Sequence, residues 1–208
     1  MKNYLEPVED GLLMRSSGPW VAKKLDYLKR YIEIFETAMR KKWQRRNFVD
    51  LFSGPGKCRT DNGRIFLGSP LLALTTTHPF TNYFFADIDS ASINALQERC
   101  KALPLYDRIR FLAEDSNEAV ARVISEIQTL DRLHKSPSLN LAFLDPEGLE
   151  LEWKTVAALA SVQKMDLIIH YPVMGLLYRL LFASKNPLGD KFWKEVIQRD
   201  VHGQRRLF

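Results

Sequence analysis

A glycine turn follows the first strongly apolar run of this sequence, and an acid stands just ahead of the turn. Residues 50–56 read Asp-Leu-Phe-Ser-Gly-Pro-Gly and come directly after Phe48-Val49. Glycine allows the backbone to approach a ligand closely, and the acid can bind a polar end group of that ligand. The pattern predicts a nucleotide-like ligand at a strand end. A strand that ends in glycines only for packing reasons would look similar.

Three more acids follow short apolar runs in the same way, namely Asp87, Asp115 and Asp145. The carboxyl ends of parallel strands lie at one edge of a sheet, where ligands of open α/β sheets bind. For single residues a structural alternative stays open. Asp87 could merely end its strand, with Asp89 or Ser90 capping the next helix, and Asp115 could merely begin a turn. Four acids in register nevertheless favour a binding site.

The spacing disfavours two common nucleotide motifs. A dinucleotide site has the pattern G-x-G-x-x-G with an acid about 20 residues further on. Here Arg59 takes the third position, and the next strand-end acid comes 37 residues (87 − 50) after the first. A P-loop has the pattern G-x-x-x-x-G-K-[ST]. Here Gly56-Lys57 is followed by Cys58, and Leu51 takes the first position. The remaining nucleotide-like ligand is S-adenosylmethionine.

An S-adenosylmethionine site needs contacts from three successive strand ends. We assign the methionine end of the cofactor to Asp50, Phe52, Gly54 and Gly56, the ribose hydroxyls to Asp87, and the adenine amine to Asp115 and Ser116. No metal is expected, because the four histidines are scattered and the only two cysteines, Cys58 and Cys100, lack paired spacing.

Residues 140–148, Asn-Leu-Ala-Phe-Leu-Asp-Pro-Glu-Gly, resemble motif IV of amino-methyltransferases, Asp/Asn-Pro-Pro-aromatic. The resemblance implies that Asp145 accepts hydrogen bonds from an exocyclic amine and aims its lone pair at a methyl donor. Pro146 would fix the turn that presents the acid. Glu147 replaces the second proline, and Gly148 replaces the aromatic residue that stacks on a flipped base. That last departure counts against a nucleobase target.

A longer series of residues across 18–175 resembles one family, the three-Cys-motif partner proteins. The series is Trp20, Lys23-Lys24-Leu25, Leu28 and Tyr31, then Asp50 with Phe52-Ser53-Gly54-Pro55-Gly56, then Gly68-Ser69-Pro70-Leu71 with Ala73-Leu74, then Asp87 and Asp89, then Asp145-Pro146 with Gly148. The Gly-Ser-Pro-Leu block and the helix with Trp and Lys-Lys-Leu are its more specific parts, because a generic methyltransferase has neither.

The resemblance implies a methyltransferase-like Rossmann fold and a protein partner. That partner is a three-cysteine-motif, radical-SAM-like protein, and the setting is a bacterial or archaeal mobile element or defence system. The family usually has phenylalanine where this chain has Glu147. Its members also tend to be longer, which implies that this chain is C-terminally short.

The net charge of +5 is unevenly distributed. Residues 1–46 hold eleven Lys and Arg but six Asp and Glu, whereas residues 47–208 hold nineteen of each. The excess is concentrated in a basic run, Arg40, Lys41, Lys42, Arg45 and Arg46, around Trp43. Such a run can bind phosphates of a nucleic acid. It could equally be a solvated helix end, where cations favour the helix dipole.

Strands alternate with helices along the chain, which predicts an α/β fold with a doubly wound, mostly parallel sheet of the Rossmann-like methyltransferase type. The predicted strands are 47–52, 83–86, 109–112, 139–144 and 167–169, and the later helical segments are 173–183 and 192–198. Residues 53–68 are expected to form a loop, after which Ser69-Pro70 starts a helix. Residues 201–208 are not expected to form a closing strand pair.

The sequence predicts three regions. Residues 1–19 form a poorly ordered lead, residues 20–46 contain an N-terminal amphipathic helix (20–42) packed on the core, and residues 47–208 form the Rossmann-like domain. No apolar run is long enough to cross a bilayer, and the first residues have no signal-peptide core. With two cysteines, this indicates a cytoplasmic protein.

Together these features predict a methyltransferase-like protein that uses S-adenosylmethionine and acts on an exocyclic amine, with nucleic acid as the leading substrate class. The alternative is a binding module, in which the Rossmann-like core serves as the partner subunit of the three-cysteine-motif protein. Glu147 and the missing aromatic residue favour this alternative.

Overall fold

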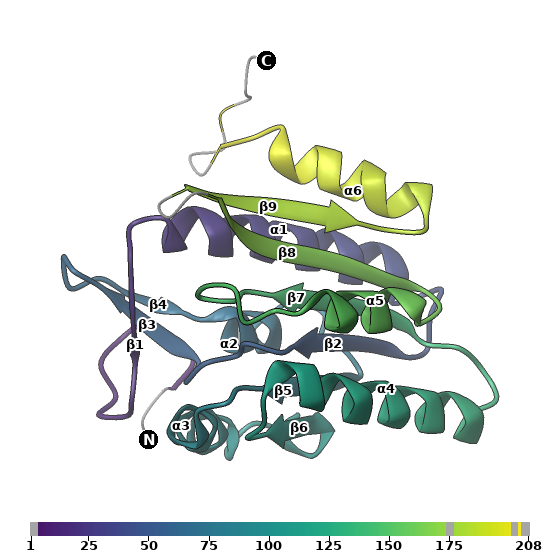
Figure 1. Cartoon of the computed structure of the whole chain (residues 1–208), viewed down its shortest axis with the longest axis horizontal. Coiled ribbons are helices and arrows are strands. Elements are labelled where there is room, and N and C mark those ends of the chain that lie inside the picture. Colours follow the sequence, from purple (N-terminus) through teal and green to yellow (C-terminus); the bar gives the residue numbers. More distant parts are fainter. Residues whose placement is uncertain (1–3, 174–176, 201–203, 205–208) are drawn as a thin grey trace.

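The centre of the computed structural model, which describes residues 4–173, 177–200 and 204, is a six-stranded sheet (Figure 1). Its order is β6-β5-β2-β7-β8-β9. The strands are β2 Arg46–Asp50, β5 Asn82–Ala86, β6 Ile109–Leu112, β7 Leu139–Leu144, β8 Met165–Val173 and β9 Leu177–Ala183. All pair in parallel except β9, which runs antiparallel to β8. This mostly parallel α/β sheet is Rossmann-like in strand order.

Helices cover both faces of the sheet, so its central strands are apolar runs and not alternating ones. The helices are α1 Val21–Met39, α2 Ser69–Leu74, α3 Ser90–Cys100, α4 Ser116–Leu133, α5 Trp153–Ser161 and α6 Pro187–Ile197, with a 3₁₀ turn η1 Tyr106–Arg108. Successive side chains of a strand point to opposite faces. Phe48 therefore packs with α1, α2, α3 and α6, whereas the next residue, Val49, packs with α4 and α5.

Helix α1, in the N-terminal part of the chain, packs against the C-terminal elements β9 and α6. The ring of Tyr31 lies 5.1 Å from that of Phe182 on β9 and 6.0 Å from that of Trp193 on α6. Its hydroxyl donates to Oδ2 of Asp166 at the start of β8, at 2.8 Å. The N-terminal amphipathic helix thus packs on the core, although it ends at Met39 and not at residue 42.

The predicted helix 173–183 is wrong, because these residues include the antiparallel strand β9. Leu180 and Phe182 face the core, and the residues between and beside them are exposed. One of those exposed residues is Leu181, 49% exposed. This leucine on the outer face hides the alternation that marks a strand, and pairing with β8 overrides the helical propensity of the leucines.

The predicted poorly ordered lead and the predicted loop 53–68 also need correction. The lead contains β1 (Arg15–Ser17), which pairs in parallel with β3 (Lys57–Thr60), and β3 pairs antiparallel with β4 (Ile65–Leu67). These short strands form a second, three-stranded sheet beside the glycine turn (Figure 1). Strands of three or four residues with no regular alternation give almost no sequence signal.

A buried ion cluster fastens the lead to the domain. Asp10 is 6% exposed and pairs with Lys57 at 2.8 Å and with Arg99 of α3 at 2.7 Å. Arg99 also donates to the carbonyl oxygens of Leu13 at 2.8 Å and Pro55 at 2.5 Å. The lead, the glycine turn and α3 are thereby joined at one point.

Other predicted boundaries shift by a few residues. Gly68, not Ser69, is the N-cap of α2. The strand predicted at 167–169 is longer in the structure, where it is β8, Met165–Val173. The helix predicted at 192–198 begins earlier, as α6. The prediction for residues 201–208 lies outside the described residues except at 204. Among the described helices, none combines the length and the apolar character that a membrane span requires.

Candidate functional site

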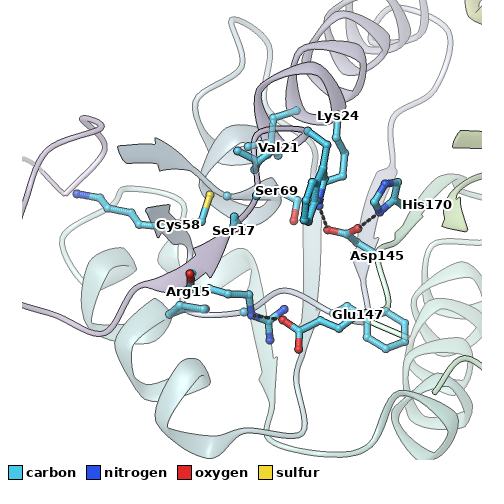
Figure 2. Close-up of a pocket in the computed structure, with 18 of the residues that line it drawn as sticks. Arg15, Ser17, Val21, Lys24, Cys58, Ser69, Asp145, Glu147 and His170 are labelled. Atoms are coloured by element: carbon cyan, nitrogen blue, oxygen red, sulfur yellow. Dashed lines mark hydrogen bonds and ion pairs between the residues drawn. The ribbon is translucent and has the colours of Figure 1, made fainter. Parts of the chain in front are cut away.

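A cleft of about 440 Å³ opens at the carboxyl ends of β2 and β7 (Figure 2). Open α/β sheets place their ligands at this edge, and the volume lies in the range of small-molecule sites. The cleft walls come from the β1 segment, the start of α1, the turn after β2 and the ends of β7 and β8. The lining residues used below are Arg15, Gly18, Trp20, Lys24, Phe52, Gly54, Gly56, Asp145, Pro146, Glu147 and His170.

The glycine turn after β2 has the conformation that only glycine adopts without strain. Gly54 and Gly56 have φ angles of 58° and 91°. A Cβ on Gly56 would lie 2.8 Å from Cδ1 of Leu96, so a larger residue would collide with α3. The N–H of Gly54 donates to Oδ2 of Asp87 at 2.8 Å, which ties the turn to the end of β5. Both glycines line the cleft, as a close backbone approach to a ligand requires.

Asp50, the last residue of β2, is fully buried and does not line the cleft. Its Oδ1 accepts from the N–H of Phe52 at 3.1 Å, whereas its Oδ2 has no hydrogen-bond partner among the described residues. Burial raises the pKa of Asp50 to about 7, and the negative charges of Asp145 and Asp87 add to the rise. Asp87 and Asp145 thus lie close enough to Asp50 to raise its pKa further.

Asp50→Asn is expected to change how stability depends on pH. In the wild type the folded state retains a proton on Asp50 that the unfolded chain releases near pH 3.8, so stability falls as pH rises from about 4 to about 7. Asparagine does not titrate, so the variant does not lose stability in this way as pH rises. The variant should therefore gain in free energy of unfolding relative to the wild type across that window and stay level above it.

Urea titrations at a series of pH values measure this difference, with Asp89→Asn as control. A hydrogen bond from Ser92 and one from the N–H of Ala91 lower the pKa of Asp89, so its contribution has the opposite sign and is lost as pH falls. An Asp50→Asn difference that stays constant from pH 4 to pH 7 would contradict the raised pKa.

Asp87 and Asp89 divide the two roles that the sequence left open. Asp89 is the N-cap of α3 and accepts from the N–H groups of Ala91 at 3.0 Å and Ser92 at 3.1 Å, which confirms its predicted capping role. Asp87 is 4% exposed and accepts from Gly54 and from the N–H of Asp89. Asp87 does not itself line the cleft, but it holds the turn that does.

Arg15 bridges two carboxylates across the cleft. Its guanidinium lies 3.4 Å from Oδ2 of Asp87. The same group lies 3.3 Å from Oε1 of Glu147 (Figure 2). It also lies 3.6 Å from the position that a Cβ on Gly54 would take. A ligand that reached Asp87 over the glycine turn would therefore have to share this space with Arg15 or displace it.

Asp145, which follows β7, is held from both sides (Figure 2). Lys24 of α1 lies 2.5 Å from its Oδ2, and Nδ1 of His170 on β8 lies 2.6 Å from its Oδ1. Burial alone would raise the pKa of Asp145, but the hydrogen bond of His170 and the charge of Lys24 outweigh it and lower that pKa. The carboxylate is therefore ionised and oriented toward a cleft that Lys24, Asp145 and His170 all line.

Of the other residues predicted to contact the cofactor, only one lines the cleft. Phe52 lines the cleft, but Asp115 and Ser116 do not. Asp115 is the N-cap of α4 and accepts from the N–H of Asn117 at 2.8 Å, the structural alternative left open by the sequence. Ser116 is buried, and no partner for its hydroxyl occurs among the described residues. Their contact with adenine stays a prediction.

The predicted basic run is divided by the fold. Arg45 and Arg46 are each 8% exposed, paired with Asp131 at 2.9 Å and with Glu36 at 2.8 Å, so these two arginines are structural and unavailable to phosphates. Arg40, Lys41 and Lys42 are exposed. They precede β2, at the opposite edge of the sheet from the cleft, so a nucleic acid seated on them would not thereby reach Asp145.

Sequence reasoning missed the residues that surround Asp145. Lys24 is among the residues that resemble the three-Cys-motif partner family, but nothing in the sequence indicates that it pairs with Asp145, 121 positions away. His170 stands at the end of a predicted strand, and that position was a usable signal. Arg15 gave none, because it lies in a segment with no recognisable pattern.

No family model and no curated protein matches this sequence. Among solved structures, protein LPL1258 of Legionella pneumophila strain Philadelphia 1, assigned to family DUF519, shares 12% identity with a TM-score of 0.53. The match covers 86% of this chain and 74% of that one. A conserved hypothetical protein of Streptococcus pyogenes shares 17% identity with a TM-score of 0.40, over 68% of this chain and 76% of that one.

The likeness to the Legionella protein concerns the fold alone. The chain belongs to the class of mixed α/β proteins whose mostly parallel sheet is compatible with a Rossmann-like fold, and its cleft lies at the carboxyl edge of that sheet.

Proposed function

We propose that this chain binds S-adenosylmethionine in the cleft and transfers its methyl group to an amine. The observation that supports this most is that Asp145 lines a glycine-walled cleft, while the buried acids Asp50 and Asp87 lie at the neighbouring strand ends, where Asp87 accepts from the glycine turn. Metal ligation does not explain the arrangement, because no group of three or more His, Cys, Asp or Glu side chains that could hold a metal ion occurs among the described residues. A cationic, nucleoside-containing ligand does explain it.

The residues present fit this cofactor. Asp50 has a buried carboxyl oxygen without a hydrogen-bond partner among the described residues, at the strand end that leads into the glycine turn. Gly54 has room for a close ligand once Arg15 moves, since the nearest atoms to a Cβ there belong to that flexible side chain. Asp87 offers a charged acceptor for hydroxyl groups. When bound, S-adenosylmethionine would supply an electrophilic methyl group.

Asp145 would hold the acceptor amine. A carboxylate has about four lone-pair sites, and Lys24 and His170 use one on each oxygen, so further sites face the cleft. An N–H of the substrate would donate to one of them, which fixes the direction of the nitrogen lone pair. Asp145 would also accept the proton that the amine loses on methylation and pass it to solvent. Much of the rate would come from this positioning.

Binding is tested most directly with S-adenosylhomocysteine, the demethylated product. At about 100 times its dissociation constant it should stabilise the fold by roughly 2.7 kcal/mol, which corresponds to about 5–11 °C in melting temperature for a chain of this size. A melting curve unmoved by millimolar S-adenosylhomocysteine or S-adenosylmethionine, in protein shown by mass spectrometry to carry neither, would contradict the cofactor assignment.

Asp87→Asn should weaken this binding by about 10- to 100-fold, because it removes a charge-assisted acceptor worth roughly 1.5–3 kcal/mol. Asp89→Asn is the matched control two residues away, and it should change affinity little because Asp89 caps α3. Calorimetry on both variants measures the two effects. If Asp89→Asn weakened binding more than Asp87→Asn, the ribose contact would belong to Asp89.

A second candidate function is a partner subunit that binds the cofactor without turning it over. Glu147 favours it, since this residue pairs with Arg15 at the cleft where amino-methyltransferases have proline. The resemblance to the three-Cys-motif partner family would supply the partner, a cytoplasmic radical-SAM-like protein. Binding of S-adenosylhomocysteine, no methyl transfer to any amine, and co-elution with that protein would together support this candidate.

A further inference from the structure

Trp20 places an aromatic ring in the cleft that also holds Asp145. Its side chain lines the cleft, and the residue remains 41% exposed. Gly148 stands where amino-methyltransferases have the aromatic residue that stacks on a base, so the loop after β7 supplies no ring at that position. Trp20 comes from a different element, the residue just before α1.

The position of the indole ring is fixed by a glycine. A Cβ on Gly18 would lie 1.9 Å from Cζ3 and 2.1 Å from Cη2 of Trp20. Such contacts are far shorter than any that real side chains make, so only glycine leaves room for the ring. The N–H of Val21 donates to the carbonyl oxygen of Gly18 at 3.2 Å, which holds this tight turn at the start of the helix.

One helical turn connects the ring to the acceptor acid. The N–H of Lys24 donates to the carbonyl oxygen of Trp20 at 3.1 Å, and side chains spaced in this way lie about 5–6 Å apart at their Cβ atoms. Lys24 in turn contacts Oδ2 of Asp145 at 2.5 Å. The cleft therefore offers a flat apolar ring and, next to it, a carboxylate that accepts N–H bonds.

We propose that Trp20 stacks on the substrate ring that bears the acceptor amine, and that this ring is an amino-bearing nucleobase in a single-stranded nucleic acid. The inference rests on the proposed function for the role of Asp145. A ring face and a carboxylate recognise complementary parts of such a base, its π-face and its exocyclic N–H. Duplexes hide both parts, whereas an unpaired base presents them.

The test isolates one base. Two fluorescein-labelled single-stranded DNA oligomers of equal length are compared by anisotropy, one with a single adenine among abasic sites and one wholly abasic. The wild type should prefer the adenine oligomer by about 5- to 140-fold, the range that corresponds to base–aromatic stacking of roughly 1–3 kcal/mol. Trp20→Ala should abolish the preference, and Trp20→Phe should retain most of it.

Two further variants separate stacking from general effects. Gly18→Ala should displace the ring and lower the preference while Trp20 is still present. Trp153→Ala removes another exposed tryptophan, 79% exposed and outside the cleft lining, and should leave the preference unchanged. The melting temperature of each variant checks its fold.

A wild type that does not distinguish the two oligomers, or a Trp20→Ala variant that still does, would overturn the inference. The outcome is independent of cofactor binding, since the preference is measured without S-adenosylhomocysteine. A protein that shows the Trp20-dependent preference but never binds S-adenosylhomocysteine would retain this base site and lose the proposed function.

Discussion

Replacing Asp10 with alanine is expected to lower the free energy of unfolding by about 3–5 kcal/mol, because it leaves two buried cations without their carboxylate. The side chains of Lys57 and Arg99 are fully buried, and Asp10 is the acid that pairs with both. Domains of ordinary stability have only about 5–15 kcal/mol in total. The loss should therefore be visible as a much lower urea midpoint at neutral pH.

The neighbouring pair of Glu9 and Arg59 provides the control. Both side chains are about half exposed, so Glu9→Ala should cost about 0–1 kcal/mol. Equal effects of Asp10→Ala and Glu9→Ala would contradict the role of the buried cluster.

Acid should remove part of the contribution of Asp10. Burial alone would raise its pKa, but hydrogen bonds from Arg99 and Lys57 outweigh burial and lower it. The contribution is present above the unfolded value of 3.8 and is lost as pH falls toward the folded pKa. The difference between wild type and Asp10→Ala should thus shrink below about pH 4.

Asp145→Ala is expected to reduce methyl transfer by about 10²–10⁴-fold, the range found for other positioned polar catalytic groups. The affinity for S-adenosylhomocysteine should change little, because Asp145 would contact the acceptor amine. Transfer of labelled methyl from S-adenosylmethionine to single-stranded nucleic acid measures the rate, and calorimetry measures the affinity. Unreduced transfer in the variant would place the chemistry elsewhere in the cleft.

Asp145→Asn is a useful companion variant. The amide keeps one acceptor oxygen but loses the charge that Lys24 and His170 surround. It should therefore fall between the wild type and the alanine variant in rate. A fold check by melting temperature is needed for both, since each weakens the ion pair of the partly buried Lys24.

The parts of the fold that the sequence predicts are those that local pattern determines. Strands β5 and β7 are largely apolar runs because helices cover both faces, and the acids at the ends of β2, β5 and β7 reach one edge of the sheet. Their order along the chain therefore predicts much of the site. Asp89 at the start of α3 is likewise predictable, because capping depends on the next three residues.

The parts that the sequence does not predict depend on distant packing. Strand β9 looks helical because exposed Leu181 interrupts its alternation, and only pairing with β8 gives it an extended form. Lys24 reaches Asp145 across 121 positions, a distance at which single-sequence patterns carry no information. Arg45 and Arg46 look like a solvent-exposed basic run because their partners, Asp131 and Glu36, are identified only after folding.

The contacts of α1 determine how late in synthesis on the ribosome the packing of this helix can be completed. Tyr31 packs against Trp193, so 162 residues (193 − 31) must be added after Tyr31 before this contact can form. At about 5–20 residues per second, this takes roughly 8–32 s. During that interval Tyr31 lacks its contact with Trp193 on the nascent chain, so ribosome stalling before residue 193 should increase aggregation and chaperone capture. Stalling well after α6 should not.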